Sequence, residues 1–399
     1  MITVQEAEKI IRRNLPLFPS ALLPLDKACG NVLREDIFAD RDQPASHKVL
    51  MDGIAIRYSS WEKGARRFKI EATQAAGQKT VSLNDPKGCI EVMTGAVLPE
   101  GTGCVIPVEH VTLEGNQAVI PEGIKLTCLQ NILPRASDYK KGERLLKAGI
   151  RLFSCQIAVL AAVGKAKVRI SYKPQIAIIA TGNELVDIHV APKSYEVRLS
   201  NSYALRAALE GNGFDEPAMF HIPDDQIQLK RRIRRILDQF DVLIFSGGVS
   251  MGKFDFVSEV LTQLGVEVLF HRVRQKPGKP FWFGISRRGK AVFALPGNPA
   301  STQVCFYRYV LPQLQRSMGM RPEKTEWAML SEDFQNKTSL TYFLPVKLKR
   351  QTDAHLLAQP VSVSGSGDYL ALARSEGFVE LEAEQRHFKR KAIVPFYRW

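Results

Sequence analysis

The sequence lacks the cysteine patterns on which zinc modules and disulfide scaffolds depend. Its 399 residues hold six cysteines, and none forms a Cys-x-x-Cys pair or stands with a histidine at zinc-finger spacing. The N-terminal segment lacks the apolar core of a signal peptide, and no apolar run reaches the roughly 18 residues that a membrane span needs. These absences predict a protein of a reducing compartment, so we expect a cytoplasmic protein that does not bind membranes.

Several catalytic and nucleic-acid-binding signatures are also missing. The scattered histidines support no Ser/His/Asp triad, and no glycine-rich segment continues into the Gly-Lys-Ser/Thr of a Walker A loop. An RNP motif, a zinc finger and an evident recognition helix are absent, so we expect no nucleic-acid partner. Positive charge is plentiful: 55 lysines and arginines stand against 41 aspartates and glutamates, a net charge of +14. This balance favours anionic ligands such as phosphates and oxyanions.

The apolar patterning divides the chain into segments of different structure. Between about residues 45 and 137, short apolar runs alternate with Gly, Pro, Asn and Asp, which is typical of a β-rich module, and the chain is β-rich again from about 323. Between them, strands are expected at 175–181, 241–246, 266–273 and 291–295, and helices at 200–212, opened by a Ser/Asn cap, and at 225–240, 256–264 and 300–318. This alternation predicts a doubly wound α/β domain. A further helical run, SCQIAVLAAVG, is expected to end at Gly164. The basic run KRRIRR (230–235) favours the solvated face of an amphipathic helix, with nucleic-acid contact as the weaker alternative.

Four loops that follow predicted strands of the α/β domain are suited to hold an anion. SGGVSMG (246–252) has two adjacent glycines whose backbone N–H groups can converge on a phosphate. KPGKP (276–280) presents two lysines on a turn restricted by proline, and LPGNP (295–299) opens a helix. TGNEL (181–185) adds a glutamate. Because the carboxyl ends of parallel strands meet at one edge of a sheet, these loops predict a ligand site there.

Carboxylates near these loops leave two interpretations open. Asp255, and the adjacent Asp224 and Asp225, could hold a metal ion, because Mg²⁺ needs only one or two carboxylates when phosphates supply the remaining ligands. They could equally cap the helices that follow them. Ordinary turn chemistry accounts for the other polar turns, which are Asp52–Gly53, Thr94–Gly95 and SGSGD (364–368).

A set of motifs occurs in an order that resembles the MoeA family of molybdopterin molybdenumtransferases. The motifs are MDGIAIR, MTGAVLPEG, ATGNEL, RLSNSYAL, SGGVSMGKFDFV, KPGKPFWFG and ALPGNPAS. The resemblance covers essentially the full chain, and the E domain of gephyrin is a related protein. It implies a multidomain α/β fold whose doubly wound, molybdopterin-binding domain is similar to the adenylyltransferases of molybdopterin. The implied division is a connecting α+β domain (1–45 plus 138–173), a β-rich insert domain (46–137), the α/β domain (174–322) and a C-terminal β-barrel domain (323–399).

The resemblance also implies an activity. It implies a transferase that inserts molybdate into adenylylated molybdopterin with release of AMP, in molybdenum cofactor biosynthesis. A requirement for Mg²⁺, a homodimer, and an active site between the α/β domain of one subunit and modules of the other are implied as well, with a molybdopterin adenylyltransferase as a further partner. These expectations suit the residues, since two anionic substrates call for lysines and N–H cradles, and a phosphoanhydride calls for carboxylates that hold a metal ion.

Matching the motifs residue by residue implies a set of site residues, whose roles are hypotheses. The implied catalytic residues are Asp52, Thr94, Glu184, Asp225 and Asp255, with Asp225 preferred to Asp224 and with Asp225 and Asp255 as the ligands of Mg²⁺. The implied substrate-binding residues are Gly247, Gly248, Ser250, Lys276, Lys279, Pro296, Pro299, Ser366 and Asp138. In these hypotheses the glycines and Ser250 cradle phosphate, the lysines meet phosphate or molybdate, and Glu184 and Asp52 orient ligand groups.

The sequence departs from the family pattern at three places. LPRASD (133–138) replaces the usual Arg-x-x-Gly-Glu-Asp turn, Pro345 replaces an arginine of the C-terminal module, and Ile54 stands where tyrosine is usual. The loss of two arginines would weaken the capture of anions. Three alternatives therefore stay open: a non-catalytic pterin-binding or scaffold paralogue, a molybdopterin adenylyltransferase, and an enzyme that uses tungstate in place of molybdate.

Overall fold

The computed structural model describes residues 1–248, 256–322, 324–352, 355–363, 365 and 367–399. The chain forms two compact units. Unit 1 consists of Met1–Glu35, Ala148–Phe153 and Val168–Trp399, and unit 2 consists of Asp36–Lys147 and Ser154–Lys167. No helix in the described part of the chain combines the length and apolar composition of a membrane span. The finer division into four domains stays a prediction.

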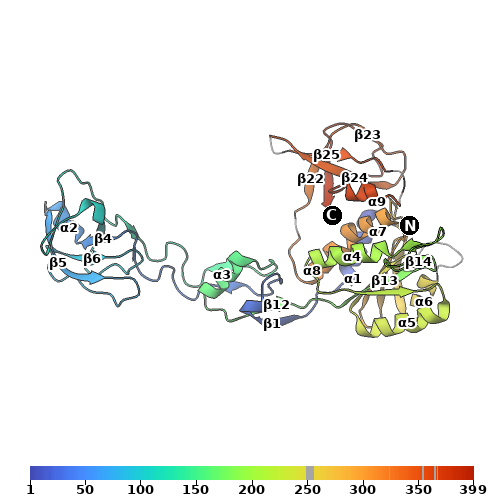
Figure 1. The fold of residues 1–399 in the computed structure, drawn as a ribbon, viewed down its shortest axis with the longest axis horizontal. Helices are drawn as coiled ribbons and strands as arrows, with labels where there is room; N and C mark the ends of the chain where they lie inside the picture. The colour runs from blue at the N-terminus through green and yellow to red at the C-terminus, as the bar shows by residue number, and fades with distance from the viewer. Residues whose placement is uncertain (249–255, 323, 353–354, 364, 366) are drawn as a thin grey trace. The chain divides into compact units, whose positions relative to one another are not determined.

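Unit 1 is built around a six-stranded sheet (Figure 1). Its strands lie in the order β16 (Ala218–Ile222), β13 (Ile176–Thr181), β17 (Val242–Ser246), β21 (Ala291–Leu295), β20 (Trp282–Ser286) and β18 (Val266–His271). The first four are parallel, and β20 and β18 are antiparallel to their neighbours. β13, β17 and β21 are buried along their whole length, as expected of strands covered on both faces. The predicted doubly wound α/β domain is confirmed.

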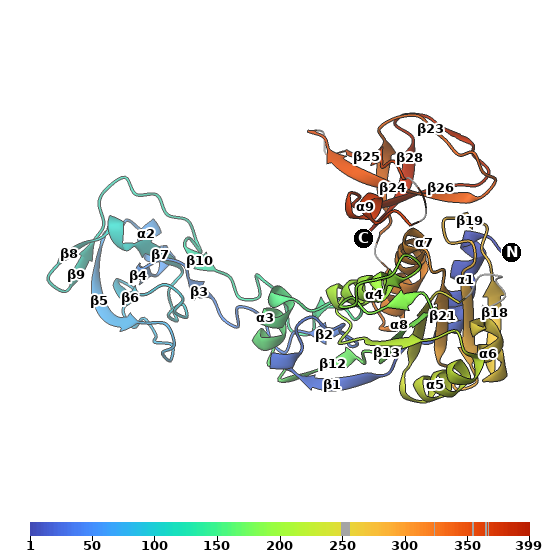
Figure 2. The same ribbon diagram turned by 45° about the vertical axis from the view of Figure 1, so that its right-hand side comes forward.

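Helices cover both faces of this sheet (Figure 2). One face carries α5 (Gln226–Gln239) and α6 (Val257–Gln263), and the other carries α1 (Val4–Asn14), α4 (Ser200–Gly211), α7 (Pro299–Cys305) and α8 (Leu311–Ser317). The helix expected at 300–318 forms in three pieces, because a π-helical turn at Phe306–Val310 joins α7 to α8. In α5, Ile233 is buried while Arg231, Arg234 and Arg235 are exposed, so KRRIRR does lie on an amphipathic helix.

The N-terminus of α4 differs from its prediction. A Ser/Asn cap was expected, but the N-cap residue is Leu199, which offers no side-chain hydrogen bond. Ser200 and Asn201 lie in the first turn instead and reach other elements: the Ser200 hydroxyl contacts the Tyr369 hydroxyl, and Asn201 binds Ser246 and Gly297. Tertiary contacts therefore take the polar groups that local capping would have used.

The C-terminal part of unit 1 is a closed five-stranded barrel. Its strands lie in the order β24 (Thr341–Arg350), β25 (Leu356–Pro360), β22 (Glu326–Leu330), β28 (Ile393–Arg398) and β26 (Gly377–Leu381), and β26 pairs with β24 to close the ring. A short helix, α9 (Tyr369–Ala373), precedes β26, and β23 (Phe334–Gln335) pairs with β27 (His387–Phe388). The barrel predicted for the C-terminal domain is confirmed.

Among the contacts that join the barrel to the α/β part of unit 1 are a strand pairing and a buried ion pair. The first is β19 (Gln275–Lys276), which pairs in parallel with β24. The second is Arg308, whose guanidinium donates to Glu380 of the barrel at 2.8 Å and to Glu8 of α1 at 2.9 Å. Arg308 and Glu380 are both buried, and a buried charge requires such pairing. These contacts hold the barrel in a defined position on the sheet domain.

Unit 2 contains the β-rich pattern seen at 45–137. Its main sheet has the order β7 (Cys104–Pro107), β4 (Gly53–Ile56), β6 (Gly88–Val92), β5 (Arg67–Gln74), β9 (Gln117–Val119) and β8 (Thr112–Glu114), with α2 (Tyr58–Glu62) beside it. Two small ladders pair β2 (Ile37–Phe38) with β11 (Arg144–Leu146) and β3 (Lys48–Val49) with β10 (Ile132–Leu133). α3 (Ser154–Ala162) ends shortly before Gly164, whose φ of 73° suits the predicted terminating glycine.

The remaining short strands belong to two ladders outside these sheets. β1 (Ser20–Pro24) pairs with β12 (Lys167–Ser171), and β14 (Leu185–Val186) pairs in parallel with β15 (Val197–Arg198). The second ladder follows β13 and ends just before α4. It therefore places the TGNEL loop beside the first turn of α4.

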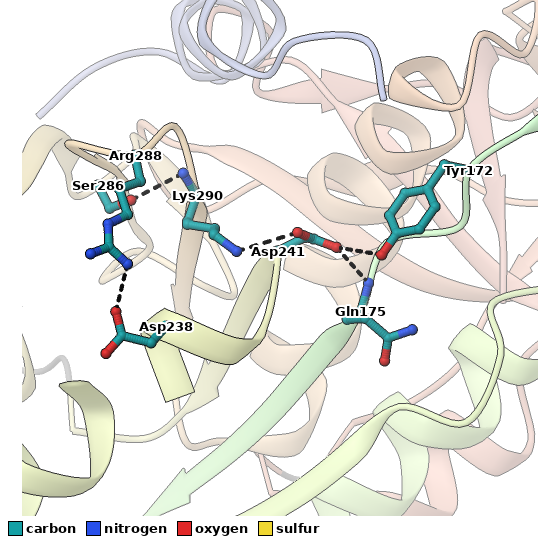
Figure 3. Close-up of polar contacts among 7 residues, drawn as sticks. All are labelled: Tyr172, Gln175, Asp238, Asp241, Ser286, Arg288 and Lys290. Atoms are coloured by element: carbon teal, nitrogen blue, oxygen red, sulfur yellow. Dashed lines mark hydrogen bonds and ion pairs between the residues drawn. The ribbon is translucent and has the colours of Figure 1, made fainter. Parts of the chain in front are cut away.

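A cluster of polar side chains connects the amino ends of β13, β17 and β21 in unit 1 (Figure 3). The Asp241 carboxylate accepts hydrogen bonds from the Gln175 backbone N–H at 2.9 Å and the Tyr172 hydroxyl at 3.2 Å, and it pairs with Lys290 at 3.3 Å. Burial and the neighbouring Asp241 carboxylate raise the pKa of Tyr172. Asp241 thus links the start of β13, the start of β17 and the turn before β21.

Loss of the Asp241 carboxylate is expected to destabilise unit 1. Asp241→Ala removes the acceptor from one backbone N–H, one hydroxyl and one ammonium group, which should lower the free energy of unfolding by about 2 kcal/mol. Chemical denaturation of the variant and of Asp238→Ala measures this. Asp238 makes a single exposed ion pair with Arg288 at 2.7 Å, so its loss should change stability by less than about 1 kcal/mol. If the two substitutions lowered the free energy of unfolding equally, the stabilising role given to Asp241 would be contradicted.

The cysteines differ in exposure, and this predicts which thiols react. Cys29, Cys128 and Cys155 are exposed, whereas Cys89, Cys104 and Cys305 are buried. Burial raises the pKa of Cys89 and Cys104 to about 12, and it also raises that of Cys305. Because the thiolate is the nucleophile, iodoacetamide at pH 8 should alkylate the three exposed cysteines first. It should alkylate the three buried cysteines only when the protein unfolds. Peptide mass spectrometry reads the order, and early labelling of Cys305 in folded protein would contradict it.

Candidate active site

A pocket of about 600 Å³ opens at the carboxyl edge of the parallel strands in unit 1. Its walls come from the loops after β13, β17 and β21, from the first turn of α4, and from α9 of the barrel. Of the residues implied by the motifs, it brings together Glu184, Gly247, Gly248, Pro296 and Pro299. The predicted convergence of strand-end loops on one site is therefore observed for three of the four loops, and Pro280 brings the end of the fourth to the same wall.

The glycine pair after β17 approaches the end of β13 more closely than any side chain would allow. Gly247 and Gly248 have φ angles of 97° and 70°. A Cβ on Gly248 would lie 2.5 Å from the Thr181 hydroxyl oxygen and 2.5 Å from a Val257 methyl carbon. Glycine is thus required here for both conformation and space. Ser250, predicted to complete this cradle, lies outside the described residues.

Asn201 joins two of the loops that form the pocket. Its side-chain amide donates to the Ser246 hydroxyl at 2.9 Å and to the Gly297 carbonyl at 2.7 Å. One residue of α4 therefore fixes the end of β17 against the turn between β21 and α7. Sequence reasoning did not select Asn201, although it lies in the motif RLSNSYAL.

Two buried hydroxyl groups line the same pocket and have no hydrogen-bond partner among the residues that the structure describes. These are the hydroxyls of Thr181 and Ser202, each in a residue only 3 % exposed. An unpaired hydroxyl in a buried position costs free energy unless a ligand or water satisfies it. The chemistry of the wall is consequently suited to a ligand that carries hydrogen-bonding oxygen atoms.

The structure separates the two adjacent aspartates. Asp225 is the N-cap of α5, because its carboxylate accepts from the Gln228 backbone N–H at 2.7 Å. Asp224 lines the pocket, and its backbone N–H donates to the Asn183 side chain at 3.1 Å. Asp225 was preferred as the functional residue, but of the two it is Asp224 that lines the pocket. The role of either aspartate stays a prediction.

The predicted lysines lie on an exposed turn rather than in the wall of the pocket. Lys276 and Lys279 are both exposed, and the Lys276 ammonium group lies 5.8 Å from the centre of the Tyr342 ring of the barrel. Tyr342 belongs to β24, which pairs with β19, so the barrel supports this turn directly. Of the turn 276–280, all of which is described, Pro280 is the residue that lines the pocket.

The barrel contributes a residue that sequence reasoning missed. Tyr369, at the start of α9, lines the pocket beside Gly367, and its hydroxyl contacts that of Ser200. Asp368 caps α9 by accepting from the Ala371 backbone N–H at 3.0 Å. The only sequence signal was the neighbouring SGSGD segment. Its predicted residue Ser366 lies outside the described part of the chain.

The remaining implied residues belong to unit 2. The Asp52 carboxylate accepts from the Thr94 backbone N–H at 2.6 Å and from its hydroxyl at 2.7 Å, and these bonds lower the pKa of Asp52. Because the folded pKa is lowered, the stabilisation is present above the ordinary pKa of an aspartate and is lost as the pH falls through the folded value. Asp138 accepts from the Ser137 hydroxyl at 3.5 Å. Whether these residues act with the pocket of unit 1 stays a prediction.

Two departures from the family pattern have a clear structural setting in unit 2. Arg135, which lies near the missing arginine of LPRASD, donates to Asp42 through two nitrogens at 2.8 and 2.6 Å. Its charge is therefore already paired, and it is not a ready substitute for an anion-binding arginine. Ile54, in place of the usual tyrosine, is buried in the apolar core of the main sheet.

The donor set of the pocket fits a hard divalent cation. Glu184 and Asp224 both line it, and Mg²⁺ is commonly bound by one or two carboxylates together with substrate phosphates. A complete protein cage is not found: the described residues contain no group of three or more histidine, cysteine, aspartate or glutamate side chains that could hold a metal ion. Asp255, predicted as a ligand, lies outside the described residues.

The fold defines a class of protein in which a doubly wound α/β domain, with a pocket at its strand ends, is joined to further β domains. Residues 177–316 match the family described as a probable molybdopterin binding domain. Residues 2–164 match the MoeA N-terminal region (domains I and II), and residues 328–399 match the MoeA C-terminal region (domain IV). The chain belongs to the MoeA family.

Individual relatives agree with this assignment over the full length. The chain is 42 % identical over 400 residues to a molybdopterin molybdenumtransferase of Synechocystis, with all of both chains covered. It is 31 % identical to a protein of the same name from Staphylococcus epidermidis, covering 98 % of this chain and 94 % of the relative. A crystal structure of a molybdopterin biosynthesis MoeA protein from Pyrococcus horikoshii superposes with a TM-score of 0.84 at 28 % identity, covering 100 % of this chain and 99 % of that one.

Proposed function

We propose that this protein is a molybdopterin molybdenumtransferase, which inserts molybdate into adenylylated molybdopterin and releases AMP in molybdenum cofactor biosynthesis. The observation that carries the proposal is the pocket at the carboxyl edge of β13, β17 and β21, which gathers the residues of several family motifs. Full-length similarity to proteins of that name supports it. The same similarity favours this activity over that of an adenylyltransferase, because the matched relatives share all parts of the chain.

The residues of the pocket divide into groups with different tasks. Gly247 and Gly248 allow a phosphate to approach the backbone, and the Thr181 and Ser202 hydroxyls donate to ligand oxygens. Lys276 and Lys279 bind the anionic part of the ligand that extends from the pocket, either phosphate or molybdate.

The carboxylates act on the phosphoanhydride end of the substrate. Glu184 orients ligand groups, and Asp224 with Asp255 holds Mg²⁺, with Asp225 retained as the alternative ligand. When bound, Mg²⁺ would neutralise charge on the phosphoanhydride. The protein residues hold the phosphate oxygens in place while water attacks and AMP leaves. Asp52, Thr94 and Asp138 complete the proposed set, and Pro296 and Pro299 shape the wall.

Further proposals concern the setting of the enzyme. We propose a homodimer in the cytoplasm, a requirement for Mg²⁺, and delivery of the adenylylated substrate by a molybdopterin adenylyltransferase. The alternative that keeps the same pocket is a paralogue that binds the pterin without transferring molybdate. It is motivated by the paired state of Arg135 and by the missing arginine at Pro345.

AMP release from adenylylated molybdopterin, measured with Mg²⁺ and with or without molybdate, tests this proposal. Molybdate-dependent release is expected, and Asp255→Ala should abolish it. Asp238→Ala is the control, because Asp238 is an exposed residue of α5 that does not line the pocket. Tight binding of the substrate without any release would overturn the transferase and favour the paralogue. Release that does not depend on molybdate would overturn the insertion step.

A further inference from the structure

The lysine turn KPGKP rests on a buried amide side chain. Gln275 is fully buried, and its amide nitrogen donates to the Pro277 carbonyl at 3.2 Å and to the Gly278 carbonyl at 3.2 Å. Both acceptors lie between Lys276 and Lys279, the residues that carry the exposed ammonium groups. The backbone from which both lysines project is thus held from below by one side chain.

The amide of Gln275 is itself held in one orientation. Its oxygen accepts a hydrogen bond from the hydroxyl of Tyr309, which is fully buried, and its nitrogen also lies 3.4 Å from the Cys305 sulfur. An amide turned by 180° would place its oxygen against the two carbonyls of the turn and its nitrogen against the Tyr309 hydroxyl. The two carbonyls can only accept, so they require the amide nitrogen to face the turn, and the Tyr309 hydroxyl donates to the amide oxygen on the other side. Tyr309 thereby helps to hold the amide in this orientation.

The turn leaves no room for an alternative packing. Gly278 has a φ of 89°, and a Cβ at this position would lie 2.6 Å from the Cys305 sulfur and 2.7 Å from the Gln275 amide nitrogen. The Lys279 carbonyl accepts from the Val273 backbone N–H at 3.0 Å, which closes the turn. The turn is consequently fixed both in its hydrogen bonds and in its packing.

We propose that Gln275, oriented by Tyr309, is a positioning residue that fixes the spacing of the Lys276 and Lys279 ammonium groups for a tetrahedral oxyanion. The inference rests on the proposed function, because it assigns the lysines to an anionic substrate. Lysine side chains are long, and the entropy cost of holding two of them on one anion falls when their backbone origins are rigid. The buried Gln275 side chain, hydrogen-bonded to the turn from inside the protein, supplies that rigidity without touching the ligand.

Tyr309→Phe is the variant that tests this inference, with Tyr307→Phe as its matched control. Both remove one phenol oxygen from the same π-helical turn, but Tyr307 has no hydrogen bond to the lysine turn. Tyr309→Phe should weaken the binding of molybdate about tenfold, as measured by calorimetry, and should raise the KM for molybdate with kcat nearly unchanged. Tyr307→Phe should leave both quantities unchanged.

A double-mutant cycle separates positioning from a general loss of stability. If Tyr309 acts through the lysines, its effect should vanish in a Lys276→Ala/Lys279→Ala background, whereas a structural effect would persist there. Gln275→Glu is a second variant, because it keeps the acceptor for Tyr309 but removes the donor to the two carbonyls. It should weaken molybdate binding in the same way.

The outcomes distinguish this inference from the proposed function. Weaker molybdate binding in the double lysine variant, with no difference between Tyr309→Phe and Tyr307→Phe, would overturn the positioning role and leave the lysine assignment intact. Unchanged binding in the double lysine variant would overturn the lysine assignment and the positioning role together. Molybdate-dependent AMP release in that same variant would still support the transferase.

Discussion

Gly248→Ala is expected to reduce AMP release by at least about 100-fold, which corresponds to about 2.7 kcal/mol of transition-state stabilisation. The new Cβ would lie 2.5 Å from both the Thr181 hydroxyl and a Val257 methyl carbon, in a backbone conformation with φ of 70°. The backbone at Gly248 must shift to accept it, which moves a segment that lines the pocket. The substitution therefore removes a phosphate cradle without removing any polar side chain.

Gly289→Ala provides a matched control for the strain of a positive φ. Gly289 has a φ of 75°, but a Cβ at that position meets nothing within 4 Å. Both variants should lose about 1 kcal/mol or more of stability from backbone strain. Only Gly248→Ala should lose activity beyond that. The kcat/KM for adenylylated molybdopterin, measured on both variants at a temperature where both are folded, compares them.

Full activity in a folded Gly248→Ala protein would mean that the loop after β17 does not contact the substrate. The phosphate would then have to bind elsewhere in the pocket. The first turn of α4 is an alternative, because the Ser202 hydroxyl lies there without a partner in the described part of the chain. The corresponding variant, Ser202→Ala, would decide between the two locations.

The parts of the fold that were predictable are those encoded by local pattern. β17 and β21 begin and end within one residue of their expected bounds, because uninterrupted apolar runs are bounded by turn residues. α5 follows from a spacing of apolar residues that buries Ile233 and leaves the arginines exposed. The convergence of the loops after these strands then follows from the parallel sheet itself.

The parts that were not predictable depend on contacts between distant segments. Asn201 looks like a helix cap in sequence, yet its amide bridges Ser246 and Gly297. Tyr369 lies far along the chain from Ser200, and nothing in either segment indicates that their hydroxyls meet. Gln275 reads as an ordinary strand residue, and only the position of Tyr309 shows that it supports the lysine turn.

Asp224→Asn is expected to reduce AMP release on the order of 100-fold. The Asp224 side chain lines the pocket with Glu184, and the substitution preserves its shape while removing the negative charge. If Asp224 helps to hold Mg²⁺, the variant should also need a higher Mg²⁺ concentration for half-maximal activity. A Mg²⁺ titration of AMP release measures both effects.

The adjacent residue Asp225 provides a control, because its substitution by asparagine is expected to leave activity unchanged. Asp225 caps α5 through the Gln228 backbone N–H, and asparagine is as good an N-cap as aspartate. Asp225→Asn should therefore be nearly neutral in both activity and stability, while Asp225→Ala should cost about 1 kcal/mol of stability and retain activity. Loss of activity in Asp225→Asn, with Asp224→Asn active, would restore Asp225 as the metal ligand. Its Oδ1 would then keep the cap while Oδ2 meets the metal ion, since an ionised carboxylate offers two acceptor oxygens.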